Sequence, residues 1–134
     1  MKSEIRYFTQ TGHTKQLADA AAEVLGINAY TIDTPITERL DVLYFGSAVY
    51  AAVVDSKVKK FIEAIDPALV GKVVCFSSAA ILPGNYRQVK RLFQLKGIQV
   101  DEREFHCRGA FMALHRGRPN QEDINNFKNW LKTL

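Results

Sequence analysis

Short apolar segments alternate with helix-patterned segments along this chain, and the alternation limits its possible folds more than any other feature. Apolar runs lie at residues 5–8, 27–32, 40–45 and 73–76, and residues 98–100 with 104–107 are expected to form the last strand region. Amphipathic helical spacing occupies residues 17–25, 58–65, 86–93 and 124–134. Strands that are apolar on both faces are typical of parallel sheets covered by helices on both sides. The pattern therefore predicts an α/β fold with a doubly wound, five-stranded parallel sheet and helices on both faces.

The length of the chain indicates one folded unit. Residues 1–134 are expected to form a single domain with a substantial core and one site. Thr34 to Arg39 link the second and third predicted strands and are too few for a full helix, so a helical turn is expected there. No apolar run reaches the ~20 residues of a membrane span, and no leader precedes the first strand. These features predict a cytoplasmic protein with no membrane partner.

A hydroxyl-rich turn follows the first apolar run and opens the first helical segment. It reads Thr9-Gln10-Thr11-Gly12-His13-Thr14. The first amides of a helix lack internal partners and can bind a phosphate, while the threonine hydroxyls add donors and Gly12 allows close approach. Because the turn has neither the lysine of a nucleotide-triphosphate loop nor a metal-binding acid, a metal-free monophosphate is the better match. An ordinary capped turn rich in threonine is the alternative.

This turn resembles the phosphate loop of the flavodoxins, which bind FMN. The features that carry the resemblance are the Thr-x-Thr-Gly-x-Thr pattern and its place directly after the first strand, near the N-terminus. The resemblance implies the flavodoxin-like strand order 2-1-3-4-5. It also implies a cofactor site beyond the carboxyl ends of the strands, between the first and the third.

Two small-residue segments resemble the flavodoxin loops that hold the flavin ring. The first, Gly46 to Val54, follows the third strand; Tyr50 in it is expected to stack on the ring, or instead to cover a strand end. The second, Ser77 to Gly84, follows the fourth strand, and Tyr86 beyond it could reach the ring or belong to the helix core. The residues expected to bind FMN are Thr9, Gln10, Thr11, Gly12, His13, Thr14, Ser47, Ala48, Val49, Tyr50, Ala51, Ser77, Ser78, Ala79, Ala80 and Ile81.

The end of the chain is also similar to that of short bacterial flavodoxins. Residues 105–111 contain a Cys-x-Gly element, and residues 116–123 read Arg-Gly-Arg-Pro-Asn-Gln-Glu-Asp before a terminal helix. Together with the phosphate loop, the resemblance spans residues 5–131. The order and spacing of these motifs favour the flavodoxin fold and FMN as cofactor.

No arrangement of side chains in the sequence indicates an acid–base or metal site. Cys75 and Cys107 lack metal-ligand spacing and are expected to be thiols, and Cys107 with Arg108 lacks the Cys-x5-Arg spacing of a phosphatase. His13 is either a cation beside the phosphate or a solvent-facing residue. Trp130 is expected to pack in the terminal helix. We therefore expect no catalytic side chain and no metal ligand.

Positive charge is concentrated in the second half of the chain. The net charge is +4; residues 1–70 hold 7 basic and 9 acidic side chains, and residues 71–134 hold 11 and 5. A basic cluster beside the predicted site favours an acidic partner or an anionic acceptor, with scattered solubilising charge as the alternative. The cluster consists of Arg108, His115, Arg116 and Arg118. No nucleic-acid partner is expected, and the sequence does not indicate an oligomeric state.

These features favour an FMN-binding electron-transfer protein in which the flavin carries the chemistry. Its partner would be a redox protein or a small acceptor such as a quinone. The alternatives are an FMN-dependent NAD(P)H:quinone-type reductase and a flavodoxin-like interaction module without redox chemistry. The resemblance gives one argument for the reductase: one-electron chemistry in flavodoxins uses a peptide flip that is easiest at glycine, and residues 47–70 contain no glycine.

Overall fold

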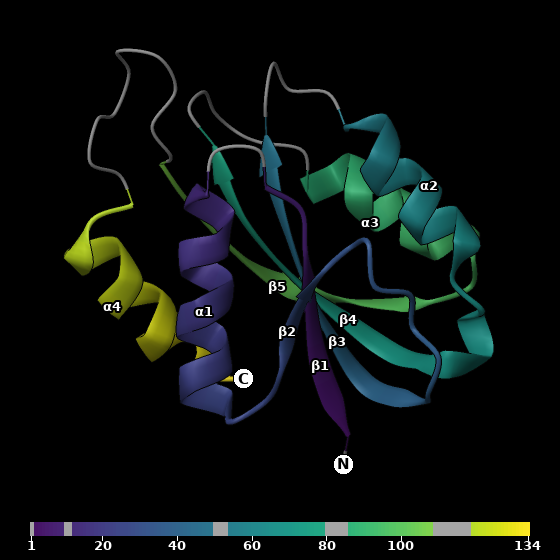
Figure 1. Ribbon diagram of the computed structural model, residues 1–134, viewed down its shortest axis with the longest axis horizontal. Helices are drawn as coiled ribbons and strands as arrows, with labels where there is room; N and C mark the ends of the chain where they lie inside the picture. The colour runs from purple at the N-terminus through teal and green to yellow at the C-terminus, as the bar shows by residue number, and fades with distance from the viewer. Residues whose placement is uncertain (1, 10–11, 50–53, 80–85, 109–118) are drawn as a thin grey trace.

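The sheet contains five parallel strands in the order expected from the sequence. The computed structural model describes residues 2–9, 12–49, 54–79, 86–108 and 119–134, without the side chains of residues 48, 49, 79, 107 and 108. The strands are β1 (Ser3–Tyr7), β2 (Ala29–Thr31), β3 (Leu40–Val49), β4 (Val70–Ala79) and β5 (Gln99–Arg108). They pair in parallel in the order β2-β1-β3-β4-β5 (Figure 1). The predicted doubly wound sheet is confirmed.

Two pairs of helices cover the two faces of the sheet. The helices are α1 (His13–Leu25), α2 (Ser56–Ala64), α3 (Tyr86–Leu95) and α4 (Gln121–Leu131), with a short 3-10 helix, η1 (Pro67–Leu69), before β4. Helix α1 packs beside α4 on one face, and α2 packs beside α3 on the other (Figure 1). Successive side chains of a strand point to opposite faces, so Tyr44 and Phe45 of β3 belong to different cores.

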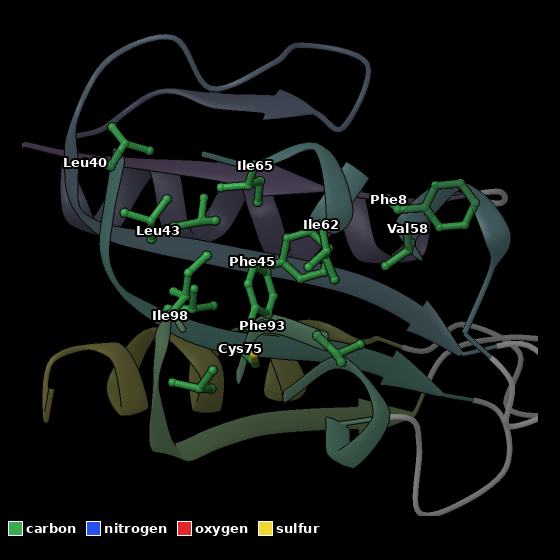
Figure 2. Close-up of a cluster of buried hydrophobic side chains, with 14 residues drawn as sticks. Phe8, Leu40, Leu43, Phe45, Val58, Ile62, Ile65, Cys75, Phe93 and Ile98 are labelled. Atoms are coloured by element: carbon green, nitrogen blue, oxygen red, sulfur yellow. The ribbon is translucent and has the colours of Figure 1, made fainter. Parts of the chain in front are cut away.

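The core under α2 and α3 is built around Phe45 (Figure 2). Its ring stacks on that of Phe61 with 5.9 Å between centroids and meets the ring of Phe93 edge-on at 5.3 Å. Phe45 and Phe93 are fully buried. Aromatic contacts of this kind add to the gain from burying the rings. They fix α2 and α3 on the sheet.

The core under α1 and α4 is also aromatic. The ring of Phe76 on β4 lies 5.1 Å from that of Phe127 on α4. Trp130 packs with Phe127 and, at 5.8 Å, with Phe105 of β5. The expected packing role of Trp130 in the terminal helix is confirmed.

The segment between β2 and β3 differs from the expectation. The helical turn expected from Thr34 to Arg39 is absent; residues 32–34 form a turn and the chain then continues without helical structure to β3. Buried Arg6 on β1 holds this segment, because its Nε donates to the Thr34 carbonyl at 2.8 Å and its Nη2 donates to the Pro35 carbonyl at 3.1 Å. Because both carbonyls accept hydrogen bonds from a charged side chain on β1, the segment is stabilised in a non-helical conformation.

Strands β3 and β4 extend further toward their carboxyl ends than expected. The loops expected to begin at Gly46 and Ser77 are strand as far as Val49 and Ala79. Ser47 pairs with Ser77, and the pairing continues over the next two residues of each strand. Small and hydroxylated residues are typical of loops. Here backbone pairing with the neighbouring strand continues past them.

Strand β5 is continuous but contains a bulge. Val73 of β4 pairs with Val100, whereas Cys75 pairs with Glu104. Three residues of β5 therefore lie opposite one residue of β4. Such a bulge changes which side chains of β5 meet the end of β4.

Asp101 stabilises this bulge. Its carboxylate accepts the backbone N–H of Arg103 at 2.9 Å and the Arg103 guanidinium at 2.7 Å, and Lys72 lies 3.4 Å away. These hydrogen bonds, those of Arg103 first, hold the pKa of Asp101 well below its usual value. The Asp101 carbonyl also accepts a hydrogen bond from the Tyr86 hydroxyl at 3.0 Å, which ties α3 to the bulge.

Candidate functional site

The carboxyl ends of β1, β3, β4 and β5 form one edge of the sheet, and the predicted site residues gather there (Figure 1). Strands β1 and β3 are neighbours, yet the helix after β1 covers one face and the helix after β3 covers the other. Ligands of open parallel sheets bind at such a switch in direction. The described residues among those predicted are Thr9, Gly12, His13, Thr14, Ser47, Ala48, Val49, Ser77, Ser78 and Ala79. Gln10, Thr11, Tyr50, Ala51, Ala80 and Ile81 lie outside the described residues.

Gly12 forms the turn between β1 and α1. Its φ of 89° lies in the left-handed region, which glycine enters without the steric cost of a Cβ. Its N–H donates to Thr9 Oγ1 at 2.9 Å. Because the Thr9 oxygen is the acceptor in this bond, its own hydrogen is left to donate elsewhere. The turn thus offers a hydroxyl donor next to the first amides of α1.

The N-terminus of α1 is built differently from those of α2 and α4. In α2, Asp55 caps the helix by accepting the Lys57 N–H at 2.8 Å, and in α4, Asn120 and Asp123 form a capping box. Among the described residues, no side chain caps α1, and its first turn contains no acid. A carboxylate there would compete with a bound anion for the amides and the positive end of the helix dipole. Helix α1 is therefore the one of these three whose N-terminus is suited to an anionic ligand.

His13, the first residue of α1, has a buried polar atom without a partner. Its Nδ1 is shielded from solvent and makes no hydrogen bond to any described residue. A buried polar atom left unpaired is costly unless a ligand or a water molecule satisfies it. The structure therefore favours a ligand-facing or water-bridged imidazole over a fully solvent-facing one.

Thr14 and Ser78 are brought together from opposite ends of the site. Both are buried, and their hydroxyl oxygens lie 2.9 Å apart. One hydroxyl must donate to the other, which leaves the hydrogen of the second available to another acceptor. The pair joins α1 to the end of β4, so the phosphate-loop segment and the fourth-strand segment form one polar unit.

The ends of β3 and β4 contribute further buried hydroxyl groups. Ser47 and Ser77 pair across the two strands and are 4% and 6% exposed. Their small side chains let backbone and ligand approach each other closely. Alternation along β4 places Ser77 and Ser78 on opposite faces of the sheet. Hydroxyl groups therefore line both sides of this edge.

Sequence reasoning missed a polar group on the α3 side of the edge. His106 Nδ1 lies 2.8 Å from Glu104 Oε1, and His106 pairs with Ser77 across the two strands. A cavity of about 10 Å³, room for about one water molecule, lies beside Glu104. Its lining residues are Ser47, Cys75, Phe76, Ser77, Tyr86, Val89 and Glu104. The i, i+2 spacing of Glu104 and His106 could have predicted a shared strand face, but not the contact with Ser77.

Cys75 and Tyr86 beside this cavity are held in their neutral forms. Burial raises the pKa of the Cys75 thiol far above its usual value, so it is a structural thiol, as expected. Burial, with nearby negative groups, raises the pKa of Tyr86 to about 12. The Tyr86 ring packs against the α2–α3 core and its hydroxyl bonds to β5, which favours the core role over contact with the ring of a cofactor.

Two kinds of feature are absent from the described part of the chain. It contains no group of three or more His, Cys, Asp or Glu side chains placed to hold a metal ion. None of its helices is both long and apolar enough to span a membrane. The side chains of the predicted basic cluster, Arg108, His115, Arg116 and Arg118, lie outside the described residues.

Comparison with known proteins places the chain in a family. The flavodoxin domain matches residues 4–111. An uncharacterized protein of Methanocaldococcus jannaschii is 26% identical over 136 residues, which cover 91% of this chain and 89% of that protein.

Solved flavodoxin structures share the fold. A flavodoxin from the domain Archaea aligns with a TM-score of 0.75 and 15% identity, covering 96% of this chain and 92% of the other. Oxidised Flavodoxin 1 from Bacillus cereus aligns with a TM-score of 0.74 and 20% identity, covering 100% and 99%. The domain match covers most of the sequence, and the strand order agrees with it. The chain therefore belongs to the flavodoxin domain family.

Proposed function

We propose that this protein binds FMN at the carboxyl edge of its sheet and passes electrons between redox partners. The observation that carries the proposal is the N-terminus of α1 at the switch point between β1 and β3, where no described side chain caps the helix and the first turn contains no acid. An anion is the ligand best suited to that position. The family and the named flavodoxin neighbours support a flavin as the molecule that bears the anion.

The described residues fit the phosphate of FMN. The first amides of α1 and the Thr9 hydroxyl hydrogen would bind its oxygens, and the unpartnered Nδ1 of His13 would gain a partner. The described ends of this turn are held by hydrogen bonds, from the Gly12 N–H to Thr9 and between Thr14 and Ser78. Their fixed positions reduce the ordering cost of binding.

The ring of the flavin would lie beyond the ends of β3 and β4. Small side chains such as Ser47 and Ser77 leave space for a flat heterocycle there, and Tyr50 is the proposed stacking partner. FMN supplies the redox chemistry when bound, and the protein supplies position and electrostatics. The nearby Cys75 and Tyr86 stay neutral at ordinary pH and would not contribute charge.

One observation favours the second candidate, an FMN-dependent NAD(P)H:quinone-type reductase. Reduction of a quinone by two electrons also consumes protons, and His106 with Glu104 is a surface pair at the same edge of the sheet. Histidine is the side chain best suited to passing protons near neutral pH. Steady-state oxidation of NAD(P)H with a benzoquinone separates the two functions. Turnover that disappears in His106→Gln at unchanged FMN content would favour the reductase.

The proposal is tested by titrating the apoprotein with FMN and with riboflavin, which lacks the phosphate. Thr9→Val removes the proposed charge-assisted hydrogen bond to the phosphate, worth ~1.5–3 kcal/mol, together with the bond from the Gly12 N–H, so the Kd for FMN should rise about tenfold or more. The Kd for riboflavin should change little. Thr9→Ser keeps the hydroxyl and is the matched control.

The outcomes of this titration are distinct. Equal losses for FMN and riboflavin would contradict the placement of the phosphate. A protein that binds neither flavin would support the third alternative, an interaction module without redox chemistry.

A further inference from the structure

The charges of this protein are divided between its two faces. Helices α2 and α3 together carry six basic residues and one acidic residue, Glu63. The six basic residues, which we name the α2–α3 basic face, are Lys57, Lys59, Lys60, Arg87, Lys90 and Arg91. Helices α1 and α4 on the opposite face carry two lysines and four acids. The two pairs of helices therefore carry net charges of opposite sign.

Both lysines of α1 and α4 are paired with acids on the same face. Lys15 lies 2.7 Å from Asp19, and Lys128 of α4 lies 3.2 Å from Glu23 of α1. By contrast, no member of the α2–α3 basic face forms an ion pair with any described residue. Lys90 lies over the Tyr86 ring, with its Nζ 5.8 Å from the ring centroid. Within the described part of the chain, the positive charge of this face is therefore not compensated by acidic side chains.

Three of these basic residues, Lys57, Arg87 and Arg91, occupy positions that do not favour their helices. Lys57 and Arg87 lie in the first turns of α2 and α3, where the positive end of the helix dipole disfavours a cation. Neither helix has a basic residue in its last turn, where a cation would be favourable. Arg87 and Arg91 are four residues apart, a spacing at which like charges repel. Helix stability therefore does not explain this arrangement.

The two first turns lie next to the candidate site. Helix α2 follows β3 and helix α3 follows β4, so both begin at the carboxyl edge of the sheet (Figure 1). A partner held by Lys57 and Arg87 would therefore be close to this edge. Of the other basic residues on the same two helices, Lys59, Lys60 and Arg91 are exposed and Lys90 is half-buried.

We propose that the α2–α3 basic face is the docking surface for an acidic protein. Opposite charge on a partner would relieve the repulsion and would steer the encounter. Two features favour a protein over a nucleic acid: Leu95 on α3 is 71% exposed, and Glu63 lies on the same pair of helices. A protein surface can offer an apolar group to Leu95 and a cationic group to Glu63, whereas the phosphates of a nucleic acid would repel Glu63. The identity of the partner as a redox protein rests on the proposed function.

The test uses the apoprotein, so that docking and FMN binding are measured separately. The probe is a labelled peptide of about twenty glutamates, followed by amide chemical shifts and by fluorescence anisotropy at several salt concentrations. Shift changes should concentrate in α2 and α3, and the affinity should fall as salt rises. The double variant Lys57→Glu/Arg87→Glu should bind the peptide with about tenfold or more lower affinity. The same variant should be no less stable than the parent, because its new acids lie at helix N-termini.

A matched control carries the same change of charge on the other face. Lys128→Glu/Lys132→Glu on and after α4 should alter the peptide affinity by no more than about twofold. Equal losses in the two variants would overturn the proposal, as would shift changes spread over the whole surface. Tighter binding of a DNA duplex of matched charge would assign the face to nucleic acid instead. Self-association of the parent that the Lys57→Glu/Arg87→Glu variant abolishes would assign it to a second copy of the chain.

The proposal and the proposed function can fail independently. FMN titration of the same samples shows whether the cofactor site is intact. A protein that binds the peptide through α2 and α3 but binds no flavin would keep the docking surface and refute the redox function. A protein that binds FMN but not the peptide would keep the proposed cofactor site and refute the docking surface.

Discussion

Gly46 and Phe76 are packed so closely at the end of the sheet that a single methyl group should disturb the fold. A Cβ added at Gly46 would lie 2.4 Å from Cε2 and 2.5 Å from Cζ of Phe76. The Phe76 ring is 1% exposed and packs against Phe127, so it has little room to move. Overpacking of this kind costs about 1–3 kcal/mol. In a domain of this size, Gly46→Ala should lower the Tm by roughly 3–15 °C.

A double-mutant cycle tests whether the cost comes from this contact. Phe76→Leu alone should destabilise the protein by about 1–2 kcal/mol, because it removes part of a buried ring. In the double variant, the new methyl group of Gly46→Ala occupies space that the ring has vacated. The double variant should therefore be more stable than the sum of the single changes predicts, by about 1 kcal/mol or more.

The assay is guanidinium unfolding of the apoprotein, since bound ligand would change the apparent stability. Val58→Ala combined with Phe76→Leu is the control, because these side chains lie in the separate cores on opposite faces of the sheet. Their effects should add within about 0.5 kcal/mol. A Gly46→Ala variant as stable as the parent, or an additive double variant, would show that the ring does not fill the space at Gly46.

Two other predictions follow from polar contacts. Thr14→Val leaves the buried hydroxyl of Ser78 without its Thr14 partner and should lower the free energy of unfolding, measured in urea, by about 1–3 kcal/mol. Adding Ser78→Ala to this variant should recover part of the lost stability. A double variant no more stable than Thr14→Val would contradict the pairing. Asp101→Asn should cost about 1 kcal/mol at pH 7. Because the pKa of Asp101 is lowered by folding, its stabilisation is present above the ordinary aspartate pKa of about 4 and is lost as the pH falls below that value. The difference between Asp101→Asn and the parent should therefore narrow between neutral and acidic pH, and a constant difference would contradict the assignment.

The sequence predicts the local features of this fold well. Alternation of apolar runs with helical spacing is a property of neighbouring residues, so the helices and strands could be located without knowing what they pack against. Asp55, which caps α2, is another such local feature, because an aspartate directly before an amphipathic run is a typical helix start. The strand order came from the resemblance to flavodoxins, because the periodicity of a strand does not identify its neighbours.

The contacts that build the site depend on long-range register. The hydroxyls of Thr14 and Ser78 meet across 64 residues of sequence. The contact of His106 with the end of β4 depends on the bulge in β5, which shifts the pairing of every later residue on that strand. A hydroxyl at a strand end therefore indicates a polar site without indicating its partner.

The position of the positive charge also depends on long-range contacts that the sequence does not reveal. It bears on whether the basic residues serve a docking partner or solubility. The sequence places the excess positive charge in the second half of the chain and predicts a basic cluster of Arg108, His115, Arg116 and Arg118 beside the site. The fold adds a second concentration of basic residues, on α2 and α3. These helices come from different halves of the sequence and lie side by side. Scattered solubilising charge would be expected on both faces, with cations placed where helices favour them. Two of the six cations, Lys57 and Arg87, lie in first turns that disfavour them, and the proposed docking of an acidic partner accounts for that placement.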